Sequence, residues 1–173
     1  MPWSPASDDK MGFLHQSGAA AILVTLTLFV QCGGMAALIK WGIDHIKRDR
    51  HALGAVRSAA LIVRLTSIMI ALHMSQILLW AAFYRWECFS SWESAFYFSI
   101  TSYSTVGYGD LVLPRQWRTL GPVESLAGVL MCGLSASFLF AIVTRLVDRE
   151  TRLSRELPRS VMEPDATLEH SRV

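Results

Sequence analysis

The sequence has little charge and little cysteine. Asp, Glu, Lys and Arg make up 17% of the 173 residues, whereas 52% are hydrophobic and the mean hydropathy is +0.35. This balance is typical of a membrane protein, and the length fits one compact unit rather than several domains. The three cysteines include no Cys-x-x-Cys pair, so they indicate neither a disulfide framework nor a metal site. We interpret Cys32 and Cys132, which lie in apolar segments, as buried thiols.

Motifs of catalysis and of nucleic-acid binding are also absent from the sequence. We find no phosphate-binding loop, no metal-ligand cluster and no Ser/His/Asp arrangement, so neither an enzyme nor a cofactor is indicated. A voltage sensor would need arginines at regular three-residue steps within one span, and none occur. The basic residues Lys47, Arg48 and Arg50 fit an anionic lipid surface better than nucleic acid.

Three apolar segments are long enough to cross a bilayer as helices, which takes about 20 residues. They run from about Ala19 to Ile39, from about Leu65 to Tyr84 and from about Pro122 to Val147. Because backbone polar groups must be paired at membrane depth, each segment is predicted to be an α-helix. The sequence therefore predicts an all-α protein of the cell membrane with several spans.

Lysine and arginine gather in two stretches, 40–64 and 145–159, which follow the first and third spans. An excess of these residues marks cytoplasmic segments, so both stretches are assigned to the cytoplasm. The N-terminus is then expected outside, as is the stretch 85–121, and the C-terminus in the cytoplasm.

The most informative motif is the hexapeptide Thr-Val-Gly-Tyr-Gly-Asp at residues 105–110. Backbone that alternates left-handed and right-handed residues turns successive carbonyls toward one axis, and glycine adopts the left-handed form at little steric cost. Gly107 and Gly109 stand two residues apart, as this alternation needs. Carbonyls arranged in this way replace the hydration shell of a potassium ion. The alternative is an ordinary glycine loop, which would be favoured if the flanking segments were not apolar.

The residues before this motif predict a short helix over 91–104. Ser90 and Glu93 fit a capping box, and apolar residues then recur at helical spacing. The helix is too short to span a bilayer, so we expect it to re-enter from outside. Its negative C-terminal end would then point to the membrane centre and favour a cation there. The alternative is a loop helix lying on the membrane surface.

Together these residues resemble the pore module of the small bacterial potassium-channel family. The resemblance covers the pore helix, the T-V-G-Y-G-D filter, Pro114 and the inner helix to Leu146. With the outer helix, it includes somewhat under half of the chain. It implies that K⁺ is bound by oxygens of the first four filter residues, with the last two at the outer mouth: Thr105, Val106, Gly107, Tyr108, Gly109 and Asp110.

The sequence departs from the family at two filter-support positions. Ser104 stands where many members have threonine before the filter. Thr101 stands where some members carry a carboxylate that braces the outer aspartate. These departures bear on filter stability and inactivation rather than on the ion that is chosen.

One chain supplies one filter strand and has no internal repeat, so a ring of carbonyls requires a homotetramer.

The predicted spans and the resemblance together divide the chain into five parts. The parts are an N-terminal segment (1–18), an extra transmembrane helix (19–43), a basic cytoplasmic loop (44–63), a pore module (64–147) and a cytoplasmic tail (148–173). Within the module we expect the outer helix at 64–84, the pore helix at 91–104, the filter at 105–110 and the inner helix at 122–147.

Polar and small residues within the spans are the remaining candidates. Glu124 is predicted to accept hydrogen bonds from the pore helix or its loop and so to support the filter; the alternative is a carboxylate that reaches the outer membrane interface. His73 and Gln76 are interpreted as structural partners of a neighbouring helix. Small residues on the third span fit either close helix packing or the lining of a cavity below the filter, and its glycines are candidate gate hinges. These residues are Ser125, Gly128, Cys132, Gly133 and Ser135.

The sequence therefore predicts passive conduction of K⁺ by a homotetramer in a lipid bilayer. A less selective cation channel remains an alternative, although Tyr108 would then be expected to be replaced. A non-conducting accessory membrane subunit is the other alternative.

Overall fold

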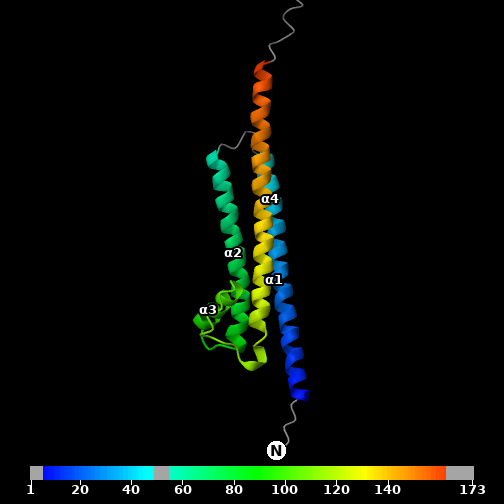
Figure 1. Cartoon of the computed structure of the whole chain (residues 1–173), viewed down its shortest axis with the longest axis vertical. Coiled ribbons are helices and arrows are strands. Elements are labelled where there is room, and N and C mark those ends of the chain that lie inside the picture. Colours follow the sequence, from blue (N-terminus) through cyan, green and yellow to red (C-terminus); the bar gives the residue numbers. More distant parts are fainter. Residues whose placement is uncertain (1–5, 49–54, 163–173) are drawn as a thin grey trace, which may run out of the picture.

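The computed structural model describes residues 6–48 and 55–162, with side chains for 12–42, 58–148 and 151–152. Three long helices lie side by side along the long axis (Figure 1). A short helix and the loop after it pack at one end, beside α2. The elements are α1 (Ala6–Arg48), α2 (Ala55–Glu87), α3 (Trp92–Tyr103), the 3₁₀ turn η1 (Arg115–Trp117) and α4 (Leu120–Met162).

The three long helices suggest a membrane protein. Within the described residues, three stretches are long and apolar enough to cross a bilayer: Gly12–Gly42, Ser58–Glu87 and Arg115–Asp148. The three spans predicted from the sequence lie inside these stretches, so their existence as long apolar helices and their order are confirmed.

The helices extend beyond the predicted bounds. α1 already begins at Ala6, inside the predicted N-terminal segment, and α4 continues to Met162, inside the predicted tail. Residues 44–48 and 55–63 of the predicted basic loop are helical, so α1 and α2 reach into this segment from both sides. Arg, Lys and Glu are good helix formers, and they prolong a helix past the point where hydropathy falls. Residues 1–5, 49–54 and 163–173 of these predicted segments lie outside the described residues.

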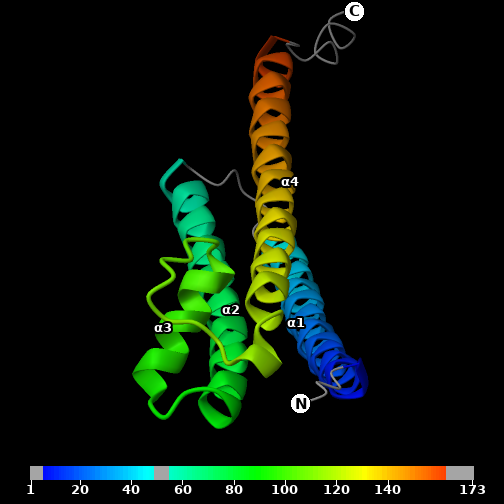
Figure 2. The same cartoon turned by 60° about the horizontal axis from the view of Figure 1, so that its bottom comes forward.

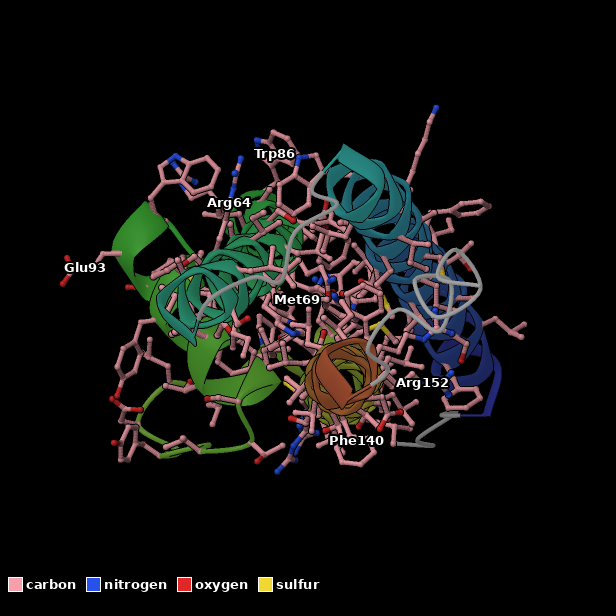
Figure 3. All side chains as sticks on the ribbon, turned by 90° about the horizontal axis from the view of Figure 1, so that it is seen from above. Arg64, Met69, Trp86, Glu93, Phe140 and Arg152 are labelled. Atoms are coloured by element: carbon pink, nitrogen blue, oxygen red, sulfur yellow. The ribbon has the colours of Figure 1, made fainter. Side chains whose placement is uncertain are left out.

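Three apolar clusters hold the helices together. One at the α3 end includes Trp80, Tyr84 and Trp117, a second includes Ile77, Tyr103 and Met131, and the third includes Leu38, Leu65 and Met69. Viewed along the bundle, Met69 points between the helices, whereas Phe140 of α4 points away from them (Figure 3). One side of α4 is therefore left without a partner in the protomer.

The start of α3 is set by Ser91. Its backbone is extended (φ −121°, ψ 147°), and its hydroxyl oxygen accepts a hydrogen bond from the Ser94 amide at 3.1 Å. The predicted capping box of Ser90 and Glu93 is therefore wrong by one residue, because the helix begins at Trp92 and Ser94 is its third residue. Glu93 points away from the helices in Figure 3 and stays in the first turn, where negative charge is favourable.

The cysteines differ from the prediction, because Cys32 and Cys132 are exposed on the protomer. Cys88 is partly buried, and burial together with Glu87 raises its pKa to about 11.

Since the thiolate is the reactive form, roughly one Cys88 in a thousand is ionised at pH 8. In a Cys32→Ser/Cys132→Ser background we expect slow alkylation of Cys88, about tenfold faster per pH unit up to its pKa. Mass spectrometry of the alkylated chain measures this rate, and fast labelling at pH 8 would contradict the expectation.

Candidate functional site

The loop after α3 has an alternating backbone. Thr105, Gly107 and Gly109 have φ angles of 62°, 49° and 78°, and the residues between them do not have positive φ. Left-handed residues therefore recur at every second position. The sequence predicted the two glycines, but not Thr105. A β-branched residue in this region is unusual and costs on the order of 1–3 kcal/mol, which the surroundings must offset.

Backbone hydrogen bonds tie this loop to the end of α3. The Thr105 amide donates to the Ser102 carbonyl at 2.9 Å, and the Gly107 amide donates to the Thr101 carbonyl at 3.0 Å. These bonds fix the direction in which the loop leaves the helix and hold Thr105 in its left-handed conformation.

The two predicted support residues next to the loop act on different groups. Thr101 contacts the loop through its carbonyl, which accepts the bond from the Gly107 amide. Its hydroxyl has one proton and faces two acceptors, the carbonyls of Tyr97 and Phe98 at 2.8 and 3.0 Å. Ser104 caps the helix, and its hydroxyl donates to the Ile100 carbonyl at 2.6 Å. Among the described residues, neither side chain hydrogen-bonds to the glycines, so their effect on the loop passes through the end of α3.

The loop itself is exposed in the protomer. Every residue from 104 to 110 is exposed, with 51% for Val106 and 73% for Tyr108. The side chain of Asp110 accepts a hydrogen bond from Tyr97 of α3, which raises the pKa of Tyr97. The sequence named Thr101 as a filter-support position without the bracing carboxylate of some relatives, and it did not identify Tyr97, which lies one turn earlier on the same helix.

α4 approaches the end of α3 very closely. A Cβ atom on Gly128 would lie 2.1 Å from the Tyr103 carbonyl oxygen, so only glycine fits at this contact. One turn earlier, the Ser125 hydroxyl donates to the Ser102 carbonyl at 2.7 Å. The last turn of α3, from which the loop emerges, is therefore held against α4.

The predicted small residues of α4 divide into two groups. Gly128 and Ser135 are buried inside the protomer, which favours packing over cavity lining for these two. Cys132 and Gly133 are exposed, and no atom lies within 4 Å of the Cβ position of Gly133. The buried side of α4 follows the steps 124, 128, 131 and 135, and Cys132 lies at its edge.

Glu124 lies where α2, α3 and α4 meet, and it is fully buried. Its Oε2 accepts a hydrogen bond from the Tyr84 hydroxyl at 2.9 Å, and its Oε1 accepts one from the Ser99 hydroxyl at 2.5 Å. The Ser99 hydroxyl also points at the Ile77 carbonyl at 2.9 Å, so one proton faces two acceptors. The structure thus brings Glu124 to Ser99 of α3, which precedes Thr105 of the glycine loop by six residues.

Two substitutions of Glu124 distinguish the contribution of its hydrogen bonds to the free energy of unfolding from that of its charge. Glu124→Ala leaves the buried Tyr84 hydroxyl without an acceptor and opens a cavity, while the Ser99 hydroxyl keeps the Ile77 carbonyl, and we expect a loss of about 3 kcal/mol of unfolding free energy. In Glu124→Gln the amide nitrogen donates to Ser99, whose proton is then free for Ile77. The variant should lie within about 1 kcal/mol of the wild type. Denaturant titration in micelles measures both, and equal losses in the two variants would contradict this account.

His73 and Gln76 contact neighbouring helices, as the sequence indicated. The Nδ1 atom of His73 lies 2.9 Å from the Tyr103 hydroxyl, and its Nε2 atom lies 3.0 Å from the Ser135 hydroxyl. Gln76 is fully buried, accepts a hydrogen bond from Tyr103 at 2.5 Å and donates one to Gln31 of α1 at 2.6 Å. Both side chains are therefore structural partners between helices.

Comparison with known families supports one class of protein. Residues 62–145 match a family model described as an ion channel. The match begins in α2, includes α3 and the glycine loop, and ends in α4, and it spans somewhat less than half of the chain. It supports an ion-channel family and places α1 outside the shared region. No curated protein and no solved structure matches the chain.

Proposed function

We propose that the chain is one subunit of a potassium-selective channel, which conducts K⁺ passively through a homotetrameric pore. The observation that carries this proposal is the alternation of left-handed residues at Thr105, Gly107 and Gly109. Such an alternation directs successive carbonyls to one side, where they replace the water around a dehydrated cation. The ligands are the main-chain oxygens of the first four loop residues and the Thr105 hydroxyl, with the last two residues at the outer mouth: Thr105, Val106, Gly107, Tyr108, Gly109 and Asp110.

The exposure of the loop supports assembly around it. A single strand surrounds only one side of an ion, and a cage needs such strands from four subunits. The loop and Phe140 lie along the same edge of the molecule in Figure 3. Large apolar residues of α4 are also exposed in the protomer: Leu126, Val129, Leu130 and Leu134. In the proposed tetramer, this side faces the pore axis and the neighbouring subunits, while lipid covers the outer helices.

The arrangement of α3 supports a re-entrant pore helix. It lies beside the end of α2 and points its C-terminal end, followed by the glycine loop, back along the bundle (Figure 2). In the proposed orientation the N-terminus is outside and the C-terminus in the cytoplasm, so α3 enters from outside. Its partial negative charge then faces the ion. The proposed partners are K⁺, other copies of the chain and the bilayer, with no cofactor and no nucleic acid.

Flux through liposomes that contain only the purified chain tests this function. We expect K⁺ flux down its gradient, a reversal potential in mixed K⁺ and Na⁺ close to the K⁺ value, and a tetramer in native mass spectrometry. A reversal potential midway between the two ions would instead indicate a less selective cation channel. The absence of flux from assembled tetramers across pH, voltage and calcium would indicate an accessory subunit and refute the proposal.

A further inference from the structure

Five buried or partly buried side chains form a closed ring of hydrogen bonds inside the bundle. The ring joins all four α-helices among the described residues, because each of them contributes at least one member. Its members are Gln31 of α1, His73 and Gln76 of α2, Tyr103 of α3 and Ser135 of α4.

With both amides oriented as in the structure, counting protons assigns every donor and acceptor of the ring. Tyr103 has one hydroxyl proton, which goes to the Gln76 carbonyl oxygen at 2.5 Å, so the His73 Nδ1–H must donate to the Tyr103 oxygen at 2.9 Å. The Gln76 amide donates to the Gln31 oxygen at 2.6 Å. The Gln31 amide donates to Ser135 at 2.8 Å, and Ser135 donates to His73 Nε2 at 3.0 Å. Each member therefore donates one hydrogen bond and accepts one hydrogen bond around the ring.

Burial makes each of these bonds costly to lose. Gln31 and Gln76 have no exposed surface, and Tyr103 and Ser135 are 3% and 8% exposed. Loss of one member leaves two others with unpaired polar groups, which is expensive in a buried environment. The ring is therefore one unit rather than a set of independent contacts.

Tyr103 connects this unit to the ion pathway. It is the last residue of α3, and Thr105 follows two residues later. Its carbonyl packs so closely against Gly128 of α4 that a side chain there would not fit. The hydroxyl of Tyr103 is held by Gln76, and the amide of Gln76 is in turn held by Gln31. A chain of two hydrogen bonds thus leads from α1 to the residue from which the glycine loop starts.

We propose that Gln31 is a positioning residue for the filter. Through Gln76 it fixes the Tyr103 hydroxyl, and thereby the place and direction in which the filter begins. This inference rests on the proposed potassium-channel function and gives α1, which lies outside the matched ion-channel region, a part in ion selection. A neighbouring bond between α1 and α2, from Trp80 to Thr27 at 3.0 Å, does not include α3 and supplies the matched control.

The test compares Gln31→Leu with Thr27→Val in reconstituted tetramers. We expect Gln31→Leu to lower the K⁺/Na⁺ permeability ratio about tenfold, and Thr27→Val to change it less than about twofold. In a Tyr103→Phe background, Gln31→Leu should add no further loss, because its effect passes through the Tyr103 hydroxyl.

Gln31→Asn, whose shorter side chain does not span both partners, is the second variant if leucine prevents assembly. An unchanged ratio in assembled Gln31 variants, or an equal loss in the Tyr103→Phe background, would overturn the inference.

A spectroscopic measurement separates this inference from the proposed function. The chain has four tyrosines, so ¹³Cζ-labelled tyrosine gives few signals, and Tyr103→Phe assigns one of them. We expect Gln31→Leu to shift the Tyr103 signal and Thr27→Val to leave it in place. If the wild type proves unselective while Gln31→Leu shifts this signal, the potassium function fails but the link from α1 to Tyr103 stands. A Tyr103 signal that Gln31→Leu leaves unchanged would refute the link itself.

Discussion

Gly128→Ala is expected to lower the free energy of unfolding by about 3 kcal/mol or more, at the upper end of the usual cost of overpacking. The added Cβ would lie 2.1 Å from the Tyr103 carbonyl oxygen and 3.0 Å from its carbonyl carbon. Both contacts are backbone atoms, so no flexible side chain can move aside. Relief would require α3 and α4 to separate, and this would break the bond from Ser125 to the Ser102 carbonyl. Denaturant titration in micelles measures the loss.

Gly133→Ala provides the matched control in the same helix. In the described part of the protomer, no atom outside its own helix backbone lies within 4 Å of its Cβ position, so alanine fits there and its higher helix propensity should add up to about 1 kcal/mol of stability. The opposite signs of the two substitutions would identify Gly128 as a packing position. A stable Gly128→Ala variant with altered open probability would instead support a hinge at this glycine.

Gly107→Ala is expected to abolish K⁺-selective flux while the tetramer still assembles. The Cβ position of Gly107 has no neighbour within 4 Å, so crowding in the protomer is not the cause. The cause is the φ angle of 49°, because a Cβ in a left-handed residue comes too close to the following carbonyl oxygen. The strain is about 1–2 kcal/mol per residue, and in a tetramer it is present in every filter strand. Relief of this strain would turn the carbonyl away from the proposed ion site.

The control for Gly107→Ala is Gly33→Ala. Gly33 lies in α1 without a neighbour within 4 Å of its Cβ position, and its φ is not positive, so alanine is compatible with its backbone. Flux and reversal potentials in liposomes, together with native mass spectrometry, compare the two variants. Selective K⁺ flux through Gly107→Ala tetramers would contradict the proposed role of the loop backbone.

The sequence predicted the three spans and the glycine loop because their signals are local. Spans depend on the length of an apolar run, and Gly107 and Gly109 mark left-handed positions by residue type alone. Thr105 carries no such mark, since its conformation depends on bonds to the end of α3. The start of α3 was missed by one residue because Ser90 and Ser91 offer the same cap to sequence reasoning.

Contacts between distant segments lie beyond local reasoning. Gln31 stands alone in an apolar run, and nothing near it in the sequence identifies Gln76 and Ser135 as its partners. Tyr97 likewise meets Asp110 only because the loop folds back along α3. For Glu124 the sequence predicted acceptance from the pore helix, and the contact with Ser99 has that form. The second partner, Tyr84 of α2, required the three-dimensional structure.

The hydrogen-bonded ring has a sense of circulation. Each member donates a hydrogen bond to the next, in the order His73, Tyr103, Gln76, Gln31, Ser135 and then His73 again. If only one of the two glutamine amides turned over, its NH₂ group would face another donor in the ring and its carbonyl oxygen would face another acceptor. Only simultaneous reversal of all members restores every bond. The amides of Gln31 and Gln76 therefore cannot rotate independently, and the junction of the helices has two complete bonding patterns with no satisfied state between them.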